Sequence, residues 1–597
     1  MVPFYDDECP MDIKNGLGRK DIESPYVRPN RPWFKSYPEW MPKTLNYEVI
    51  EKLNGLFCIL KLVEMNCPNN VAIYFKPREE KITYRELLYY TLKMANALKS
   101  LGVKKGDPIA LNSTNCSEFI IAMWACIKLG AILVPINPLL KKAEVSHILR
   151  DCGDIKIAIV HEKNFSLFKR SSKEFDIKKL ILIKKDKYDD KSIKEKHIEG
   201  VEIFDFHKLL NEFDPLKEKI TINMKEDIFA LLYTGGTTGL PKGVMLTHFN
   251  VLSNINQLLA FGEEVTEENI EKNFGKLSFV NILPLCHSFG VISVLTYMSV
   301  AMQIIIFDTF DIPAILEAIE LYKVQAFNGI PTIYIMMANH PDFEKRDLSS
   351  LENVITSGAA LADAVAERWR KIAGVEVRQG YGLTECSPGT HLQPQYWAKW
   401  KPNSIGMPII DTDVKIVNPD TLEELPIGEK GELLIRGPQV MKGYWKKPEA
   451  TKRVFVEDEN GNIWLRTGDI GYMDEDGYFY ISGRTKEMIK YKGYRILPFE
   501  VEKTLYEHPA VLEAGVIGIP DEVVGEKIKA FIRLRPEFVG KITEQEIIEW
   551  AKENMAGYKW PREIEFVSSI PKTPVGKIMR RALLEKELKR SKIKDNK

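Results

Sequence analysis

The feature that most constrains the fold of this chain is the segment at residues 233–248, which reads YTGGTTGLPKGVMLTH. It directly follows the apolar run at residues 228–232, which predicts a buried strand. Glycines let backbone amides approach an anion closely, threonine hydroxyls add hydrogen-bond donors, and a lysine supplies positive charge. The sequence therefore predicts a strand that ends in a polyphosphate-binding loop. The expected phosphate-binding residues are Thr234, Gly235, Gly236, Thr237, Thr238, Gly239 and Lys242.

The P-loop of nucleotide hydrolases, GxxxxGK[ST], is the obvious alternative for such a loop. Here Lys242 follows Pro241 instead of glycine, and it precedes Gly243 instead of serine or threonine. The proline also disfavours helical geometry at Leu240, whereas the lysine of a P-loop opens a helix. The segment is therefore a different kind of phosphate-binding loop.

Strands and helices alternate on both sides of this loop. Residues 71–75 predict a strand, and the capping box at residues 83–86 (TYRE) opens a helix that ends near Leu101, before Gly102. Such alternation predicts parallel α/β sheets with ligands at the carboxyl ends of the strands. Further strand-like runs lie at residues 107–111, 131–135, 155–160, 180–183, 279–283, 304–307, 325–328 and 353–356.

The length of 597 residues predicts several domains, because one hydrophobic core does not grow to this size. Residues 1–45 are rich in proline and aromatic residues and predict an N-terminal arm. We expect a large domain at residues 46–482, made of two α/β subdomains and a small β-rich subdomain at about residues 401–482. An α+β C-terminal domain is expected at residues 483–597.

Four further motifs follow the loop. They read QGYGLTE at residues 379–385, WLRTGD at residues 464–469, GRTKEMIKYKGYRI at residues 483–496 and PKTPVGK at residues 571–577. Each one alone has an ordinary structural explanation: a tight turn around a buried tyrosine, a turn aspartate, a charged surface strand and a solvated lysine.

Taken together and in this order, the five motifs resemble those of the adenylate-forming superfamily of acyl-CoA synthetases, luciferases and peptide-synthetase adenylation domains. The resemblance covers roughly residues 45–580. Many members carry serine at the position of Gly235, and the GGTTG form is similar to that of fatty-acyl-CoA ligases. The resemblance implies that Tyr381 packs on adenine and that Thr384 contacts the α-phosphate. It also implies that Glu385, with a contribution from Thr234, binds Mg²⁺, which prefers carboxylates combined with substrate phosphates.

The same resemblance assigns roles to the later motifs. Asp469 is the expected ribose ligand, Arg484 reaches the nucleotide, and Lys486 is the hinge of a mobile C-terminal domain. Lys577 is expected to stabilise charge while a carboxylate attacks the α-phosphate. The expected coenzyme A channel residues are Lys492 and Gly493. The remaining residues implied to contact ATP or AMP are Gly358, Ala359, Gln379, Gly380 and Gly382.

The segment LPLCHSFG at residues 283–290 resembles the opening of the superfamily's acyl pocket. The implied pocket residues are His287, Phe289, Gly329 and Gly358. A lone histidine is more often a hydrogen-bonded core group than a ligand of this kind. The residues that follow His287 are mostly apolar, which favours a fatty acid as the substrate.

Composition excludes several other classes of function. The chain has 83 basic and 83 acidic residues, so no nucleic-acid partner is expected. Its eight cysteines show no metal-ligand spacing and predict reduced thiols. The opening residues MVPFYDDECP are acidic and contain no apolar h-region, so no signal peptide is expected. The longest apolar stretch, at residues 119–134, is too short to span a bilayer. A cytoplasmic location is expected, while peripheral membrane contact and a homodimer stay open.

We therefore expect an AMP-forming fatty acid–CoA ligase that uses ATP, Mg²⁺ and coenzyme A. A carboxylate and ATP would give an acyl-adenylate and pyrophosphate, and a thiol would then give acyl-CoA and AMP. An apolar pocket gains only about 0.8 kcal/mol per methylene, so it discriminates weakly between neighbouring chain lengths. The alternatives are a medium-chain, short hydroxy-acid or aromatic acid–CoA ligase, a stand-alone adenylation enzyme that loads a carrier protein, and a luciferase-like oxygenase.

Overall fold

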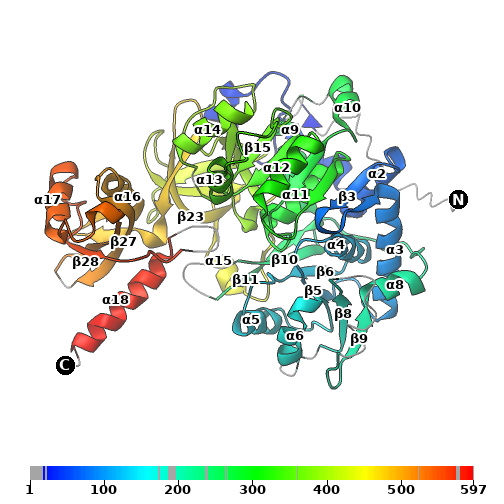
Figure 1. The fold of residues 1–597 in the computed structure, drawn as a ribbon. Helices are drawn as coiled ribbons and strands as arrows, with labels where there is room; N and C mark the ends of the chain where they lie inside the picture. The colour runs from blue at the N-terminus through cyan, green and yellow to red at the C-terminus, as the bar shows by residue number, and fades with distance from the viewer. Residues whose placement is uncertain are drawn as a thin grey trace. The chain divides into compact units, whose positions relative to one another are not determined.

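The computed structural model describes residues 18–19, 23–172, 175, 177–185, 196–234, 240–262, 264, 266–359, 361–521, 523–572 and 578–595 (Figure 1). The chain divides into two compact units. The first comprises Met1–Asp413 and Arg436–Leu465, and the second comprises Val414–Ile435 and Arg466–Lys597.

The first unit contains an eight-stranded sheet with the order β21-β11-β10-β6-β5-β7-β8-β9. The six strands from β10 to β9 pair in parallel, whereas β11 and β21 are added antiparallel at one edge. Its strands are β5 (Pro108–Asn112), β6 (Ile132–Pro135), β7 (Ile157–His161), β8 (Lys179–Ile183), β9 (Glu202–Asp205), β10 (Ile228–Thr234), β11 (Lys242–Thr247) and β21 (Gly443–Tyr444).

A nine-stranded sheet of the same unit has the order β18-β17-β16-β15-β14-β12-β13-β3-β4. The strands from β16 to β3 pair in parallel, and the outer strands β4, β17 and β18 are antiparallel. Its strands are β3 (Val71–Phe75), β4 (Glu80–Thr83), β12 (Ser278–Asn281), β13 (Gln303–Ile306), β14 (Ala326–Gly329), β15 (Asn353–Thr356), β16 (Val377–Gly382), β17 (Gly389–Leu392) and β18 (Met407–Pro408).

Helix α4 (Ser117–Leu129) lies between the two sheets, because it packs against β5 and β6 of one and β3 of the other. Twelve of its thirteen residues are buried, as expected of a helix that is apolar on every side. Its buried acid, Glu118, forms an ion pair with Arg78 at 2.8 Å and accepts a hydrogen bond from His207 Nε2 at 2.9 Å. These partners keep the pKa of Glu118 well below its usual range despite its burial.

Other helices cover the sheets and hold the strand ends in place. α5 (Lys142–Cys152) and α6 (Phe165–Ser172) pack on the eight-stranded sheet, and α12 (Ile312–Leu321), α13 (Pro331–Ala338) and α14 (Asp363–Ala373) pack on the nine-stranded sheet. The other α-helices described in this unit are α1 (Tyr47–Ile50), α2 (Phe57–Asn66), α3 (Tyr84–Ser100), α8 (Phe206–Glu212), α9 (His248–Gly262), α10 (Glu267–Asn273), α11 (Ser288–Ser299) and α15 (Pro448–Lys452).

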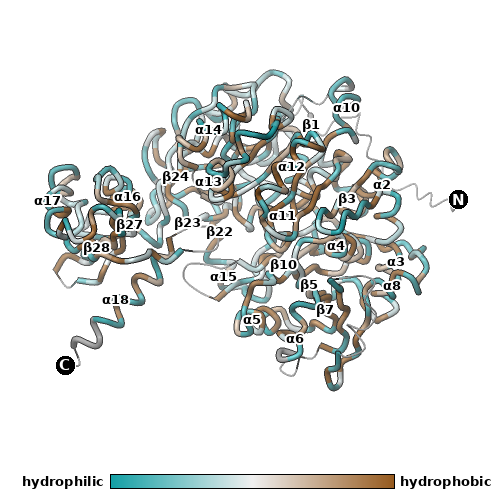
Figure 2. The backbone as a smooth tube through the Cα atoms, viewed as in Figure 1, coloured by the Kyte–Doolittle hydropathy of each residue, from teal (hydrophilic) through white to brown (hydrophobic). Residues whose placement is uncertain are grey.

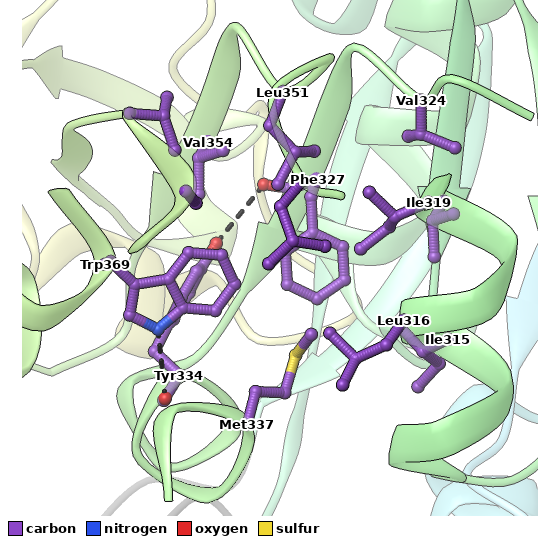
Figure 3. Close-up of a cluster of buried hydrophobic side chains, with 14 of the residues drawn as sticks. Ile315, Leu316, Ile319, Val324, Phe327, Tyr334, Met337, Leu351, Val354 and Trp369 are labelled. Carbon is purple, nitrogen blue, oxygen red and sulfur yellow. Dashed lines mark hydrogen bonds between the residues drawn. The ribbon is translucent and has the colours of Figure 1, made fainter. Parts of the chain in front are cut away.

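Figure 3 shows the core beneath the nine-stranded sheet, where aromatic side chains fix the end of β14. The Trp369 indole donates a hydrogen bond to the Tyr334 carbonyl oxygen at 3.1 Å, and the Tyr334 hydroxyl donates to the Phe327 carbonyl oxygen at 3.2 Å. The Tyr334 ring lies so close to Gly329 that a Cβ there would be 3.0 Å from its Cε2. This packing holds the carboxyl end of β14.

The described part of the N-terminal arm packs on the first unit through aromatic and charged side chains. Trp33 is buried, and the Tyr37 ring makes edge contacts with Phe261 and Trp397 at centroid distances of 5.9 and 6.1 Å. The buried carboxylate of Asp413 accepts from the Arg31 guanidinium at 2.6 Å. Burial of these groups ties the arm to the unit.

The second unit contains two smaller sheets. In the first, β23 (Ile463–Met473) pairs with β24 (Phe479–Arg484) and lies beside β20 (Gly431–Arg436), which neighbours β19 (Asp413–Val417). The opening residues of β23 belong to the first unit, where they pair with β22 (Phe455–Glu457). The other sheet contains β25 (Ile489–Tyr491), β26 (Tyr494–Ile496), β27 (Val511–Asp521), β28 (Gly525–Leu534) and β29 (Glu563–Phe566), and its helices are α16 (Pro498–Tyr506), α17 (Glu544–Asn554) and α18 (Arg580–Asp595).

The expected α/β class is confirmed, and so is the capping box that starts α3, in which Thr83 and Glu86 bond reciprocally. Figure 2 shows the contrast between the hydrophobic helix α11 and the mostly hydrophilic helix α18. Within the described ranges, none of the helices combines the length and the apolar character needed to cross a bilayer. The domain boundary at residue 483 and the hinge at Lys486 stay predictions.

Candidate active site

The ends of the predicted phosphate loop are held by an antiparallel strand pair. Thr234, the last residue of β10, lies opposite Lys242, the first residue of β11. The Pro241 carbonyl oxygen accepts a hydrogen bond from His147 Nε2 of α5 at 2.8 Å. Outside the described residues lie the predicted loop residues Gly235, Gly236, Thr237, Thr238 and Gly239.

Helix α5 supports the same strand pair from one side. The Tyr233 hydroxyl donates to Asp151 Oδ2 at 3.1 Å, and Asp151 also pairs with Lys447 at 2.5 Å. Burial and the nearby carboxylate raise the pKa of Tyr233 far above its usual value, so the hydroxyl stays a donor. The base of the loop is therefore anchored by side chains as well as by the sheet.

Tyr444 of β21 links this loop to the QGYGLTE motif. The Lys242 ammonium lies 4.4 Å from the centre of the Tyr444 ring, and the Tyr444 hydroxyl donates to Glu385 Oε1 at 2.8 Å. Burial and the charge of Glu385 raise the pKa of Tyr444 well above its usual range. A cation, an aromatic ring and a carboxylate thus form one connected set between two motifs that are far apart in the sequence.

The QGYGLTE motif lies mostly within β16, which pairs with β17 in a hairpin. A Cβ on Gly382 would lie 2.0 Å from the Pro388 carbonyl oxygen, so only glycine fits where the two arms of the hairpin approach. The Tyr381 ring makes an edge contact with His391 at 5.7 Å between centroids. Burial lowers the pKa of His391 to about 3, so this ring is neutral near pH 7.

The segment that follows β15 approaches the same motif. Gln379 Oε1 accepts a hydrogen bond from the Leu361 amide at 3.3 Å, and the Ser357 amide donates to the Gly329 carbonyl oxygen at 3.3 Å. Gly358, with φ at +92°, and Ala359 are exposed on this segment. Gly380 lies on β16 beside Gln379, so the ATP-binding candidates of the two segments are neighbours on the nine-stranded sheet.

Thr384 and the predicted acyl-pocket segment are in contact. The hydroxyls of Thr384 and Ser288 lie 3.3 Å apart, and Ser288 opens α11 directly after His287. His287 Nε2 lies 3.3 Å from Asn137 Nδ2. Surrounding protein atoms lower the pKa of His287 by desolvation, although the residue as a whole stays exposed. Phe289 is half-buried next to this pair.

In the second unit, two nucleotide-binding candidates form an ion pair. Asp469 of β23 lies opposite Arg484 of β24, and Arg484 Nε is 2.9 Å from Asp469 Oδ1. The Asp469 side chain is only 7% exposed, and its amide donates to Thr467 Oγ1 at 3.0 Å. The carboxylate is therefore held in place by its own strand and by the neighbouring one.

The remaining candidates of the second unit lie near its second sheet. Lys486 is exposed in a short helical turn before β25. Lys492 and Gly493, with φ of +47° and +83°, form the two-residue turn between β25 and β26, the geometry of a type I′ hairpin. Lys577 lies outside the described residues.

The first-unit residues form an oxygen-rich donor set suited to a nucleotide and a hard cation. Glu385 is partly exposed, and Thr234 and Thr384 supply hydroxyls. Among the described residues, no three or more His, Cys, Asp or Glu side chains gather as a metal site. One carboxylate with hydroxyls still fits Mg²⁺, because this ion takes its other ligands from water and substrate phosphates.

Sequence reasoning did not find the supporting residues His147, Asp151, His391 and Tyr444. Each contacts a predicted site residue, or its neighbour, from a distant or structurally separate segment. Their roles depend on tertiary contacts that a single sequence does not display.

Comparison with known proteins gives consistent matches along the chain. The family model described as AMP-binding enzyme matches residues 63–445, and that of the AMP-binding enzyme C-terminal domain matches residues 500–577. A long-chain-fatty-acid–CoA ligase of Bacillus subtilis (strain 168) is 36% identical over 583 residues, which cover 95% of this chain and 100% of that protein.

Two solved structures resemble the fold of this chain. A crystal structure of an anthranilate CoA ligase in complex with anthranoyl-AMP has a TM-score of 0.75 at 29% identity, covering 90% of this chain and 98% of that one. A fatty acyl CoA synthetase of Mycobacterium tuberculosis has a TM-score of 0.69 at 28% identity, covering 90% and 99%. With family models matching both parts and a relative matched over its full length, this chain belongs to the AMP-binding enzymes.

Proposed function

We propose that this enzyme is an AMP-forming long-chain fatty acid–CoA ligase. One observation carries the proposal: contacts connect the predicted phosphate loop to the predicted acyl-pocket segment. Lys242 contacts Tyr444, Tyr444 contacts Glu385, and the adjacent Thr384 contacts Ser288 beside His287. Groups suited to phosphates, a metal ion and a carboxylic acid thus adjoin one another in the first unit.

In the first step, a carboxylate oxygen of the acid attacks the α-phosphorus, and the bond to pyrophosphate breaks. We propose that Lys242, at the base of the loop, neutralises phosphate charge and that the Thr384 hydroxyl, which contacts Ser288, binds the α-phosphate. Glu385 and Thr234 would hold Mg²⁺, which when bound supplies further charge neutralisation. Lys577 is proposed to stabilise the same transition state.

In the second step, the coenzyme A thiol attacks the acyl carbon and releases AMP. We propose that Lys492 and Gly493 line the thiol channel and that the C-terminal domain at residues 483–597, the part of the second unit that carries them, rotates about Lys486. The hairpin turn at Lys492 presents its side chain at an exposed tip, which supports a contact with a ligand. In the same unit, Asp469 and Arg484 are proposed to bind the ribose and the nucleotide.

A long-chain acid is supported by the relatives, since the Bacillus subtilis protein is named a long-chain-fatty-acid–CoA ligase. The apolar character of α11 after His287 agrees with such a substrate. We retain a cytoplasmic location for this enzyme. It is supported by the scattered spacing of the eight cysteines, which predicts reduced thiols.

The proposal is tested by measuring AMP release from ATP and Mg²⁺ with saturated acids from acetate to stearate, each with and without coenzyme A. We expect sustained AMP release only with coenzyme A, with a maximum among the long chains. A maximum at short, hydroxylated or aromatic acids would overturn the substrate class. Turnover that requires an acyl-carrier protein instead of coenzyme A would overturn the acceptor.

A further inference from the structure

Tyr444 lies between two residues of the proposed active site, Lys242 and Glu385. Before ATP binds, the Lys242 ammonium and the Glu385 carboxylate carry opposite charges in one site. Tyr444 contacts both: its ring face lies 4.4 Å from Lys242 Nζ, and its hydroxyl donates to Glu385 Oε1 at 2.8 Å. A cation over an aromatic face and a carboxylate at a hydroxyl are both favourable arrangements.

The backbone around Tyr444 is fixed on several sides. The Tyr444 amide donates to Thr451 Oγ1 at 2.9 Å, and β21 pairs with β11 so that Tyr444 lies opposite Val244. The preceding Met441 amide donates to the Glu385 carbonyl oxygen at 2.8 Å. The tyrosine is 7% exposed, so its ring is held by packing as well as by these bonds.

We propose that Tyr444 is a positioning residue that orients Glu385 for the metal ion and holds Lys242 at the base of the phosphate loop. With Oε1 engaged by the Tyr444 hydroxyl, the carboxylate is turned in one direction and Oε2 is left for a cation. With the ring face under its ammonium, Lys242 is held beside β21 at the base of the loop. This inference rests on the proposed function, because the roles of Glu385 and Lys242 belong to it.

Two substitutions separate the contributions of the hydroxyl and the ring. Tyr444→Phe removes one oxygen and keeps the aromatic face, so it should weaken the metal site while leaving Lys242 in place. Tyr444→Leu removes both the hydroxyl and the aromatic ring, so it should weaken the metal site and also raise the KM for ATP. Tyr480→Phe is a matched control in the second unit, since the Tyr480 hydroxyl donates to the Asp474 carboxylate at 3.1 Å and has no role in the site.

The direct readout is the affinity of the enzyme for Mn²⁺. Enzyme mixed with α,β-methylene-ATP is titrated with Mn²⁺, and the electron paramagnetic resonance signal reports the concentration of free Mn²⁺. Loss of a hydrogen-bond partner of a metal ligand typically costs 10- to 100-fold in affinity, so we expect at least roughly tenfold weaker Mn²⁺ binding for Tyr444→Phe. Wild-type affinity in Tyr444→Phe, or an equal loss in Tyr480→Phe, would overturn the proposal.

Kinetics provide a second readout that a general structural fault would not reproduce. In Tyr444→Phe, the Mg²⁺ concentration for half-maximal ATP–pyrophosphate exchange should rise roughly tenfold, while kcat at saturating Mg²⁺ should recover. A kcat that stays low at every Mg²⁺ concentration, or an ATP KM that is the same in Tyr444→Leu and Tyr444→Phe, would contradict the assigned roles. Absence of AMP formation by the wild type would refute the proposed function alone, because Mn²⁺ binding is still measured independently.

Discussion

Gly382 offers a prediction whose size follows directly from the hairpin geometry. In Gly382→Ala, the new Cβ would lie 2.0 Å from the Pro388 carbonyl oxygen, whereas real Cβ contacts stay beyond 3.0 Å. The arms of the β16–β17 hairpin must therefore separate by about 1 Å, the difference between these two distances. Thr384 and Glu385 follow within three residues, so the displacement reaches the proposed catalytic groups.

A misplacement of this size costs on the order of 100-fold in rate, and overpacking in a buried site costs about 1–3 kcal/mol of stability. We expect Gly382→Ala to lower kcat/KM for AMP release by roughly 100-fold and to reduce the free energy of unfolding in urea. Gly262→Ala is the control, because a Cβ there meets no atom within 4 Å. Equal kcat/KM values for the two variants would refute the reasoning.

Three further predictions concern other parts of the chain. The pKa of Glu118 is lowered in the folded state, so its ionised form stabilises the fold fully above the unfolded pKa of about 4.5. This stabilisation is lost progressively as the pH falls from 4.5 toward the lower pKa of the folded state. Glu118→Gln should therefore reduce the free energy of unfolding in urea by about 3 kcal/mol at neutral pH, and the difference from wild type should narrow as the pH falls below 4.5. A difference independent of pH would contradict this. Lys577→Ala should abolish adenylate formation but spare thiolation of preformed acyl-adenylate; equal loss in both half-reactions would remove that role. Lys492→Glu should spare ATP–pyrophosphate exchange and raise the KM for coenzyme A; unchanged coenzyme A kinetics would count against the channel.

Local signals predicted much of the fold. The capping box at Thr83 and the strand at residues 71–75 depend on periodicity and on caps within a few residues, and the structure has them at these positions. β16, by contrast, runs from Val377 to Gly382, where the glycines give no local strand signal. Pairing with β17 extends it through the glycines, because the partner strand and not local propensity decides the pairing.

The site was predicted as a set of motifs, but its connections were not. Tyr444 and Glu385 are 59 residues apart, and Ser288 and Thr384 are 96 apart. Such contacts form only when β11, β21 and β16 are assembled in their sheets, so no local sequence pattern predicts them. The sequence did not predict the chain length of the acid either. The residues of α11 are apolar, but a helix buried in the core needs apolar residues whatever the length of the substrate.

The most direct test of the central claim follows the oxygen atoms of the acid. Palmitate labelled with ¹⁸O in its carboxyl group is incubated with ATP, Mg²⁺, coenzyme A and the enzyme. The mass of the nucleotide product is then measured by mass spectrometry. Attack of the carboxylate on the α-phosphorus, followed by thiol attack on carbon, leaves one labelled oxygen in AMP. Unlabelled AMP would contradict the adenylate mechanism, and so would the formation of ADP together with labelled inorganic phosphate.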